Sequence, residues 1–111
     1  SVYIQLIDSA LTKLDGAYAQ NTIRSYHSDA SQFVDWCLGA GVTPFPLEEA
    51  TLIHYLECIQ HRHAFTTLRR RTSSIRRVNG LLGHPDIPQA EPYRLAIRRI
   101  KRAKPIRTRQ A

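Results

Sequence analysis

The sequence contains no methionine and only two cysteines, Cys37 and Cys58. Two cysteines are too few for a disulfide framework, and both fall within helical patterns of apolar residues, so we expect reduced thiols buried in the core. No apolar run approaches the roughly 20 residues that a membrane-spanning helix needs, so we expect a soluble protein with no membrane contact. Because even position 1 is not methionine, we expect these 111 residues to be a piece of a longer protein.

Patterns that carry catalysis or hold a metal are also scarce. The sequence has no nucleophile elbow, no acid pair and no glycine-rich phosphate loop. Cys58, His61 and His63 lie close together, but they lack the paired spacings of a zinc site, so we interpret them as a helix end with a buried cysteine and exposed imidazoles. We therefore expect no metal, no cofactor, no small-molecule substrate and no catalytic activity in this chain.

Acidic side chains are few in the second part of the chain. Residues 1–65 carry three Lys or Arg against seven Asp or Glu, whereas residues 66–111 carry thirteen against two. The net charge of +7 is therefore confined to one part of the molecule. A polyanion-binding surface follows more naturally from this asymmetry than a uniformly basic protein does, and it makes nucleic acid the leading partner.

Apolar residues recur at helical spacing along the whole chain, and no strand alternation or internal repeat is present. We predict an all-α fold, a compact bundle of about five helices around one core. The predicted helices cover residues 2–14, 21–39, 47–60, 66–82 and 92–104. Asn21 and either Thr66 or Thr67 are the predicted N-caps of the second and fourth helices. On the second helix, Asp29 and Asp35 are predicted on the side opposite the apolar stripe.

The helix at 66–82 is the element around which the chain is organised. Five of the sixteen basic residues lie within these seventeen positions. A helical projection places Leu68, Thr72, Ile75, Val78, Asn79 and Leu82 on one side, and Thr66, Arg69, Arg70, Ser73, Arg76 and Arg77 on the other. The charged side has no acidic residue of the helix among its arginines, and guanidinium groups along one helical face suit the major groove of DNA. A solvated charged face is the alternative interpretation.

Two further regions carry candidate DNA contacts. The second helix begins with Arg24, Ser25 and Ser28, close to an N-terminus whose free amides favour a phosphate. The last helix and the tail after it are rich in cations. The candidates there are Arg98, Arg102, Lys104, Arg107 and Arg109, on elements suited to phosphates.

The second helix also carries a family resemblance. Residues 21–26 (NTIRSY), followed by Asp29, Phe33, Trp36 and Cys37, resemble the core-binding domain of tyrosine recombinases. Further matching features occur in the family's order: Pro46, Tyr55-Leu56, TLRRR at 67–71, Ser74-Ile75, the 83–88 loop and IRRIKR at 97–102. The last of these resembles the Cre-like branch. The resemblance covers roughly residues 11–104.

The resemblance implies a SAM-like, DNA-binding N-terminal domain, residues 1–104, that clamps a recombination half-site with the second and fourth helices in the major groove. It matches Arg24, Ser25, Thr66 and Arg70 to groove-facing positions, and Lys104, Arg107 and Arg109 to a basic interdomain linker, which we place at 105–111. It further implies double-stranded DNA and other protomers on that DNA as partners, a cytoplasmic, nucleoid-associated protein, and a catalytic half with its tyrosine nucleophile outside this chain. His61 to Ala64 depart from the family, whose members often have a glycine there.

A second class of function remains compatible with the residues. The chain could be a stand-alone helical regulator, or a protein-interaction module whose basic helix docks an acidic partner. An Arg, His-x-x-Arg, Tyr series beyond Ala111 would favour the recombinase, and its absence would favour the regulator.

Overall fold

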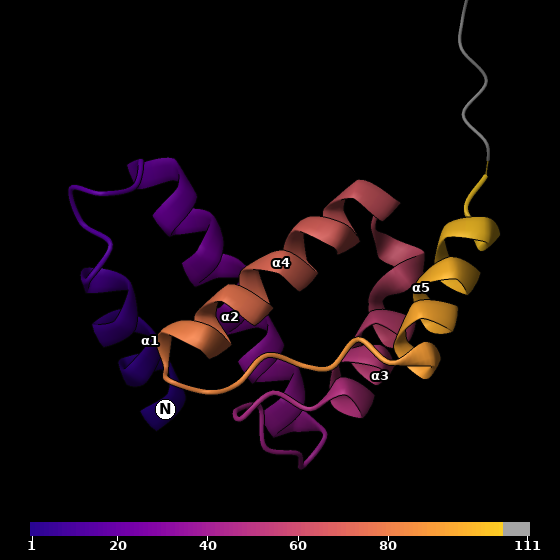
Figure 1. The fold of residues 1–111 in the computed structure, drawn as a ribbon, viewed down its shortest axis with the longest axis horizontal. Coiled ribbons are helices and arrows are strands. Elements are labelled where there is room, and N and C mark those ends of the chain that lie inside the picture. The colour runs from indigo at the N-terminus through magenta and orange to yellow at the C-terminus, as the bar shows by residue number, and fades with distance from the viewer. Residues whose placement is uncertain (106–111) are drawn as a thin grey trace, which may run out of the picture.

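The computed structural model describes residues 1–105, and within them the fold is all-α with no strand. Five α-helices follow one another, and a single 3-10 turn, η1, extends the third of them. Their bounds are α1 Val2–Thr12, α2 Gln20–Gly39, α3 Glu49–Ile59, η1 Gln60–Arg62, α4 Phe65–Leu81 and α5 Glu91–Ala103. The predicted bundle of about five helices is thus confirmed (Figure 1).

The core is built from the predicted apolar stripes. In α2, Ala30, Phe33, Val34 and Cys37 have no exposed surface, because residues three and four apart share the face that turns toward the other helices. The rings of Phe45 and Tyr55 pack edge-on against Phe33, so the loop before α3 and α3 itself close over α2. The core is therefore one cluster to which all five helices contribute.

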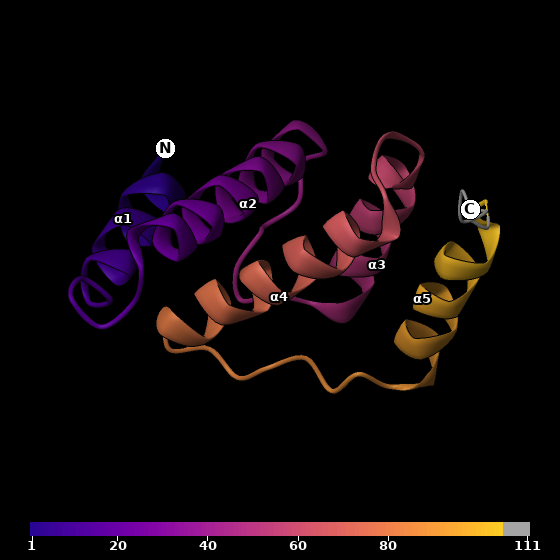
Figure 2. The same cartoon turned by 90° about the horizontal axis from the view of Figure 1, so that it is seen from above.

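Helix α2 packs most closely against α4, and α1 packs on α2 beside it. Helix α5 instead packs on α3, and it is reached by a long segment after α4 that crosses the molecule (Figures 1 and 2). As a result α1 and α5 lie at opposite ends of a body measuring 44 × 34 × 25 Å. No helix within residues 1–105 is long and apolar enough to cross a lipid bilayer.

The predicted helix starts differ from those observed. Helix α2 begins at Gln20 and α4 at Phe65, each preceded by an alanine that makes no side-chain cap. The capping predictions for Asn21, Thr66 and Thr67 were therefore wrong, because each of these residues lies inside its helix. Asn21 accepts instead from the guanidinium of Arg24, one turn further along α2.

Candidate nucleic-acid interface

The polar side chains of α4 project from two sides of the helix, and the exposed surface between them forms a ridge. Thr66, Arg69, Ser73 and Arg76 follow one another at intervals of three or four residues and line hollows on the α5 side. Arg70 and Arg77 lie on the other side, where they contact α2 and the segment before it. The single cationic face predicted from the sequence is therefore two rows of basic side chains.

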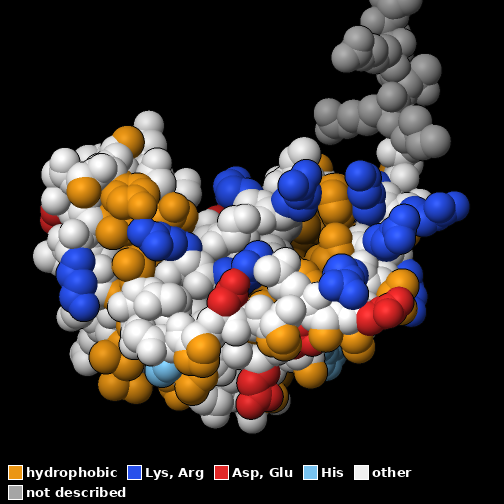
Figure 3. All heavy atoms as spheres, viewed as in Figure 1, with side chains coloured by type: hydrophobic (Ala, Val, Ile, Leu, Met, Phe, Trp, Pro, Cys, Tyr) orange, Lys and Arg blue, Asp and Glu red, His pale blue; other side chains and the backbone are white. Residues whose placement is uncertain are grey.

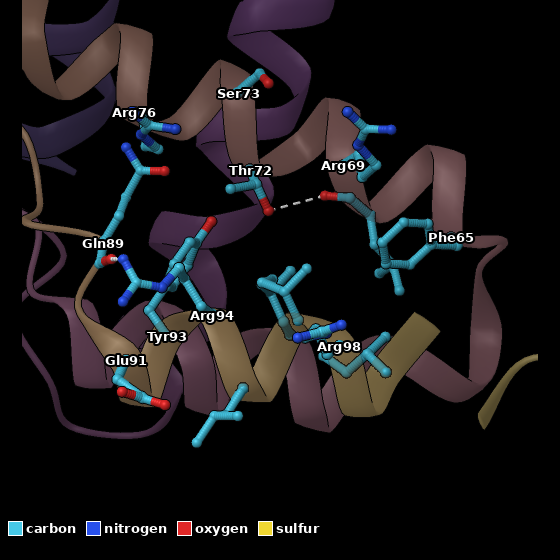
Figure 4. Close-up of a pocket in the computed structure, with 15 residues that line it drawn as sticks. Phe65, Arg69, Thr72, Ser73, Arg76, Gln89, Glu91, Tyr93, Arg94 and Arg98 are labelled. Atoms are coloured by element: carbon cyan, nitrogen blue, oxygen red, sulfur yellow. Dashed lines mark hydrogen bonds between the residues drawn. The ribbon is translucent and has the colours of Figure 1, made fainter. Parts of the chain in front are cut away.

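A groove of about 500 Å³ separates α4 from α5. Its apolar lining includes Leu68 and Phe65 from α4 and Ile97 from α5. Arg69 and Arg76 border it on the α4 side, and Arg94 and Arg98 border it on the α5 side, as Figure 4 shows. In the space-filling view, Lys and Arg side chains gather around the apolar floor over these two helices (Figure 3).

Two of the α4 arginines have acidic partners from elsewhere in the chain, which the helical projection did not show. Arg76 forms a bidentate pair with Asp86, with its Nε 3.0 Å from Oδ1. The hydrogen bonds from Arg76 lower the pKa of the Asp86 carboxyl and raise the pKa of the Arg76 guanidinium. The Arg76 side chain is only 28% exposed, so we interpret it mainly as a contact that holds the 82–90 segment against α4.

The second pair joins α4 to α2. The Arg70 Nε and Nη2 donate to the two carboxylate oxygens of Asp29 at 3.1 and 3.0 Å, and the Ser74 Oγ donates to Asp29 at 2.7 Å. Asp29 is completely buried, so the prediction that it lies on the exposed side of α2 was wrong. The hydrogen bonds that Arg70 donates to Asp29 raise the pKa of the Arg70 guanidinium.

Two further arginines of α4 contact tyrosines. Arg77 donates to the Tyr18 hydroxyl at 2.8 Å and also stands over the Tyr18 ring. Arg71 is buried and donates to the Tyr55 hydroxyl at 3.2 Å, so it belongs to the core and not to the surface. Burial raises the pKa of Tyr55, and the hydrogen bond from Arg71 works against that shift.

The candidates at the start of α2 lie on the far side of the molecule from α5. Arg24 and Ser28 are exposed and Ser25 is half-buried. Arg24 and Ser28 border a hollow against α1 that also contains Asp8 and Asp15. Their surroundings therefore hold two acidic residues, whereas the groove beside α4 is lined by four arginines and one acidic residue, Glu91.

At the end of α5, Arg102 is exposed and Lys104 is half-buried. The Lys104 ammonium donates to the carbonyl oxygen of His63 at 2.8 Å and to that of Gln60, which ties the end of α5 to η1. Burial, followed by the neighbouring cations, lowers the pKa of His63. Arg107, Arg109 and residues 106–111 of the linker predicted at 105–111 lie outside the described residues.

The cysteines differ from the prediction and from each other. Burial raises the pKa of the Cys37 thiol to about 11, as expected for a core residue. Cys58 is exposed, so its predicted burial was wrong, because it lies outside the stripe of Leu52, Tyr55, Leu56 and Ile59 that α3 turns inward. Across the described part of the chain, no three His, Cys, Asp or Glu side chains are grouped so that they could hold a metal ion.

Asp29 is the site residue that sequence reasoning missed, although a signal was present. It lies three residues after Tyr26 and four before Phe33, so it falls beside the apolar stripe of α2. Ser74 stands four residues after Arg70, which puts both donors on one side of α4. This pattern indicates an interhelical pair: a carboxylate lies at the edge of one helix's apolar stripe, and two donors lie one turn apart on another helix.

Comparison with known proteins gives one informative similarity. Over 66 residues, 60% of this chain, the sequence is 33% identical to an integrase/recombinase XerD homologue from Selenomonas ruminantium. The chain covers 19% of that protein's length. No family model matches the sequence. No solved structure matches it either. The similarity supports a relationship to integrases and recombinases.

Proposed function

We propose that this chain is the DNA-binding, core-binding domain of a site-specific tyrosine recombinase, with α4 and the start of α2 in the major groove of a half-site. The observation that carries the proposal is the ridge of α4, which has basic side chains on both sides and no acidic residue of its own. The similarity to an integrase/recombinase points to the same function.

The chemistry of the α4 surface suits duplex DNA. Arg69 and Ser73 are exposed, and Arg94 and Arg98 line the opposite wall of the groove, so cations stand on two neighbouring helices. The major groove is wide enough to admit an α-helix, and the phosphates that border the groove attract cations flanking that helix. Arg69, Arg98 and Arg102 are therefore assigned to phosphates, and Arg70 to a base edge.

Residues 1–104 form the proposed domain, and residues 105–111 lead toward a catalytic half that supplies the tyrosine nucleophile. Breaking and rejoining of DNA is accordingly assigned to that half.

Replacing Arg69 with alanine should weaken binding to every duplex alike. Each phosphate that a cation neutralises releases condensed counterion, so the plot of log affinity against log salt should lose about one unit of slope. Fluorescence anisotropy with labelled random-sequence duplexes at several salt concentrations measures this. Lys13→Ala, the same charge change at the C-terminal end of α1 and outside the proposed DNA contacts, is the control and should leave the slope unchanged.

Two results of that experiment would reject the proposal. Equal affinity of the chain for poly-glutamate and for duplex DNA would indicate a module for acidic partners. An unchanged slope in Arg69→Ala would remove α4 from the interface. In addition, binding reactions stopped in denaturant should contain no covalent protein–DNA species, and such a species would overturn the assignment of catalysis to another domain.

The other proposed partner is a second protomer bound beside the first on DNA. Val2 is 61% exposed and Leu6 is 47% exposed on α1, and α5 lies at the opposite end of the molecule. An apolar patch at one end and a helix at the other can meet in successive protomers. The proposed contact is α1 of one protomer against α5 of its neighbour.

Leu6→Asp should abolish cooperative binding to duplexes long enough for two protomers, because it puts a charge into the apolar contact. Its affinity for a duplex that holds one protomer should not change. Titrations followed by sedimentation measure both quantities. Leu38→Asp, a leucine of similar exposure on α2, is the control. Undiminished cooperativity in Leu6→Asp would exclude α1 from the contact.

A further inference from the structure

The carboxylate of Asp29 is fully engaged inside the molecule. Its two oxygens accept three hydrogen bonds, two from Arg70 and one from Ser74, and the residue has no exposed surface. These contacts cross the interface between α2 and α4, the most extensive helix pair of the fold. The buried Asp29 therefore holds the Arg70 side chain, which is itself 54% exposed to solvent.

Arg70 cannot leave this position without cost. Moving its guanidinium to a phosphate would leave a buried carboxylate with Ser74 as its only donor, and a buried charge without its partner is strongly unfavourable. Arg69 differs, because it is exposed and makes no hydrogen bond to another described side chain. Of these two neighbouring arginines, one is free to follow a phosphate and the other is fixed.

The fixed guanidinium still has donors to offer. Arg70 uses the edge formed by Nε and Nη2 for Asp29, which leaves both hydrogens of Nη1 and the second hydrogen of Nη2. Nη1 makes no hydrogen bond within residues 1–105. The unused end of the guanidinium is thus a planar pair of parallel donors. Two parallel donors match the O6 and N7 acceptors that guanine presents in the major groove.

We infer that Asp29 is a positioning residue that fixes Arg70 as a guanine reader, so that a buried carboxylate which never touches DNA determines base specificity. The inference rests on the proposed DNA-binding function, and it assigns the base specificity of that function to the Asp29–Arg70 pair. An arginine held in one orientation loses less freedom on binding and distinguishes a base edge from a phosphate. An unheld arginine would bind whichever acceptor was nearer.

The test is a selection of duplexes from a random library by the 111-residue chain and by its Asp29→Asn variant. The asparagine side chain keeps the shape of Asp29, but it replaces one acceptor oxygen with an NH2 group. Because this group is a donor that faces the donors of the guanidinium, Arg70 is released. The wild type should enrich a motif containing guanine. Asp29→Asn should lose about 10- to 100-fold in preference at one or two base pairs of that motif, while its affinity for random duplexes stays within about twofold.

Two further variants and a folding check make the result decisive. Asp35→Asn removes the same charge from an exposed position of α2 and should select the wild-type motif. Arg70→Lys keeps a cation beside Asp29 but lacks the planar edge, so it should lose the same base pairs even if Asp29→Asn proves too unstable to assay. Circular dichroism confirms that each variant is folded.

The possible failures are distinguishable. A wild-type chain that retains no DNA at all would reject the proposed function. A wild-type chain that enriches a motif, with Asp29→Asn folded and selecting the same motif, would overturn the role of Asp29 alone. Undiminished preference for the guanine in Arg70→Lys would overturn the inference as well, because an ammonium lacks the planar pair of parallel donors that Asp29 holds in place.

Discussion

Replacing Phe33 with alanine should lower the free energy of unfolding by about 3 to 5 kcal/mol, the largest effect that we expect of a single substitution in this chain. Phe33 has no exposed surface, and its ring centroid lies 5.9 Å from that of Phe45 and 5.1 Å from that of Tyr55. The alanine would leave a cavity where the 42–46 loop, α2 and α3 meet. Small domains are stable by only about 5 to 15 kcal/mol, so the variant should be near its unfolding threshold.

Denaturant unfolding followed by circular dichroism measures this change. Phe65→Ala is the matched control, because Phe65 is only half-buried at the start of α4, and its loss should be clearly smaller. Equal losses for the two variants would mean that the Phe33 site collapses around the smaller side chain and that the three rings are not a rigid unit.

Asn79→Ala should cost about 2 to 4 kcal/mol for a different reason, since it removes hydrogen bonds and not apolar volume. Asn79 is completely buried; its Oδ1 accepts from the Leu47 amide at 2.9 Å and its Nδ2 donates to the Pro85 carbonyl at 3.0 Å. The alanine leaves the amide of the buried Leu47 without a partner. The segment before α3 and the segment before α5 would each lose one hydrogen bond to α4.

Denaturant unfolding and amide hydrogen exchange test this together. The Leu47 amide should exchange faster in Asn79→Ala. The exchange rates of core amides in α2 should change only as much as the change in global stability requires. Asn21→Ala, an exposed asparagine of α2, should change neither quantity beyond a few tenths of a kcal/mol. A Leu47 amide that stays protected would show that another group satisfies it.

The helical stripes could be predicted from the sequence because they depend on local periodicity alone. Leu52, Tyr55, Leu56 and Ile59 fall on one face at any crossing angle, and all four are buried. The same local rule places Leu68 and Ile75 in the core. The fold class follows from such patterns, since five apolar stripes without strand alternation can be buried only by packing helices together.

The partners of the polar residues could not be predicted in this way. A helical projection treats Asp29 and Arg70 as solvated charges on separate helices, and their pairing depends on how α2 crosses α4, 41 residues later in the chain. The same holds for Arg71, which the projection could not place beside the Tyr55 hydroxyl. The sequence therefore located the cationic helix, whereas the division of its arginines into fixed and free ones required the three-dimensional structure.

The Lys104 ammonium donates to the carbonyl of Gln60, the first residue of η1, and to that of His63, the residue after η1, so it is a point where a pull on the end of α5 passes to η1. A pull on the chain after Pro105 is resisted first at η1, directly before α4 begins. The tension therefore reaches the arginine-bearing helix before it reaches α1 at the other end of the body.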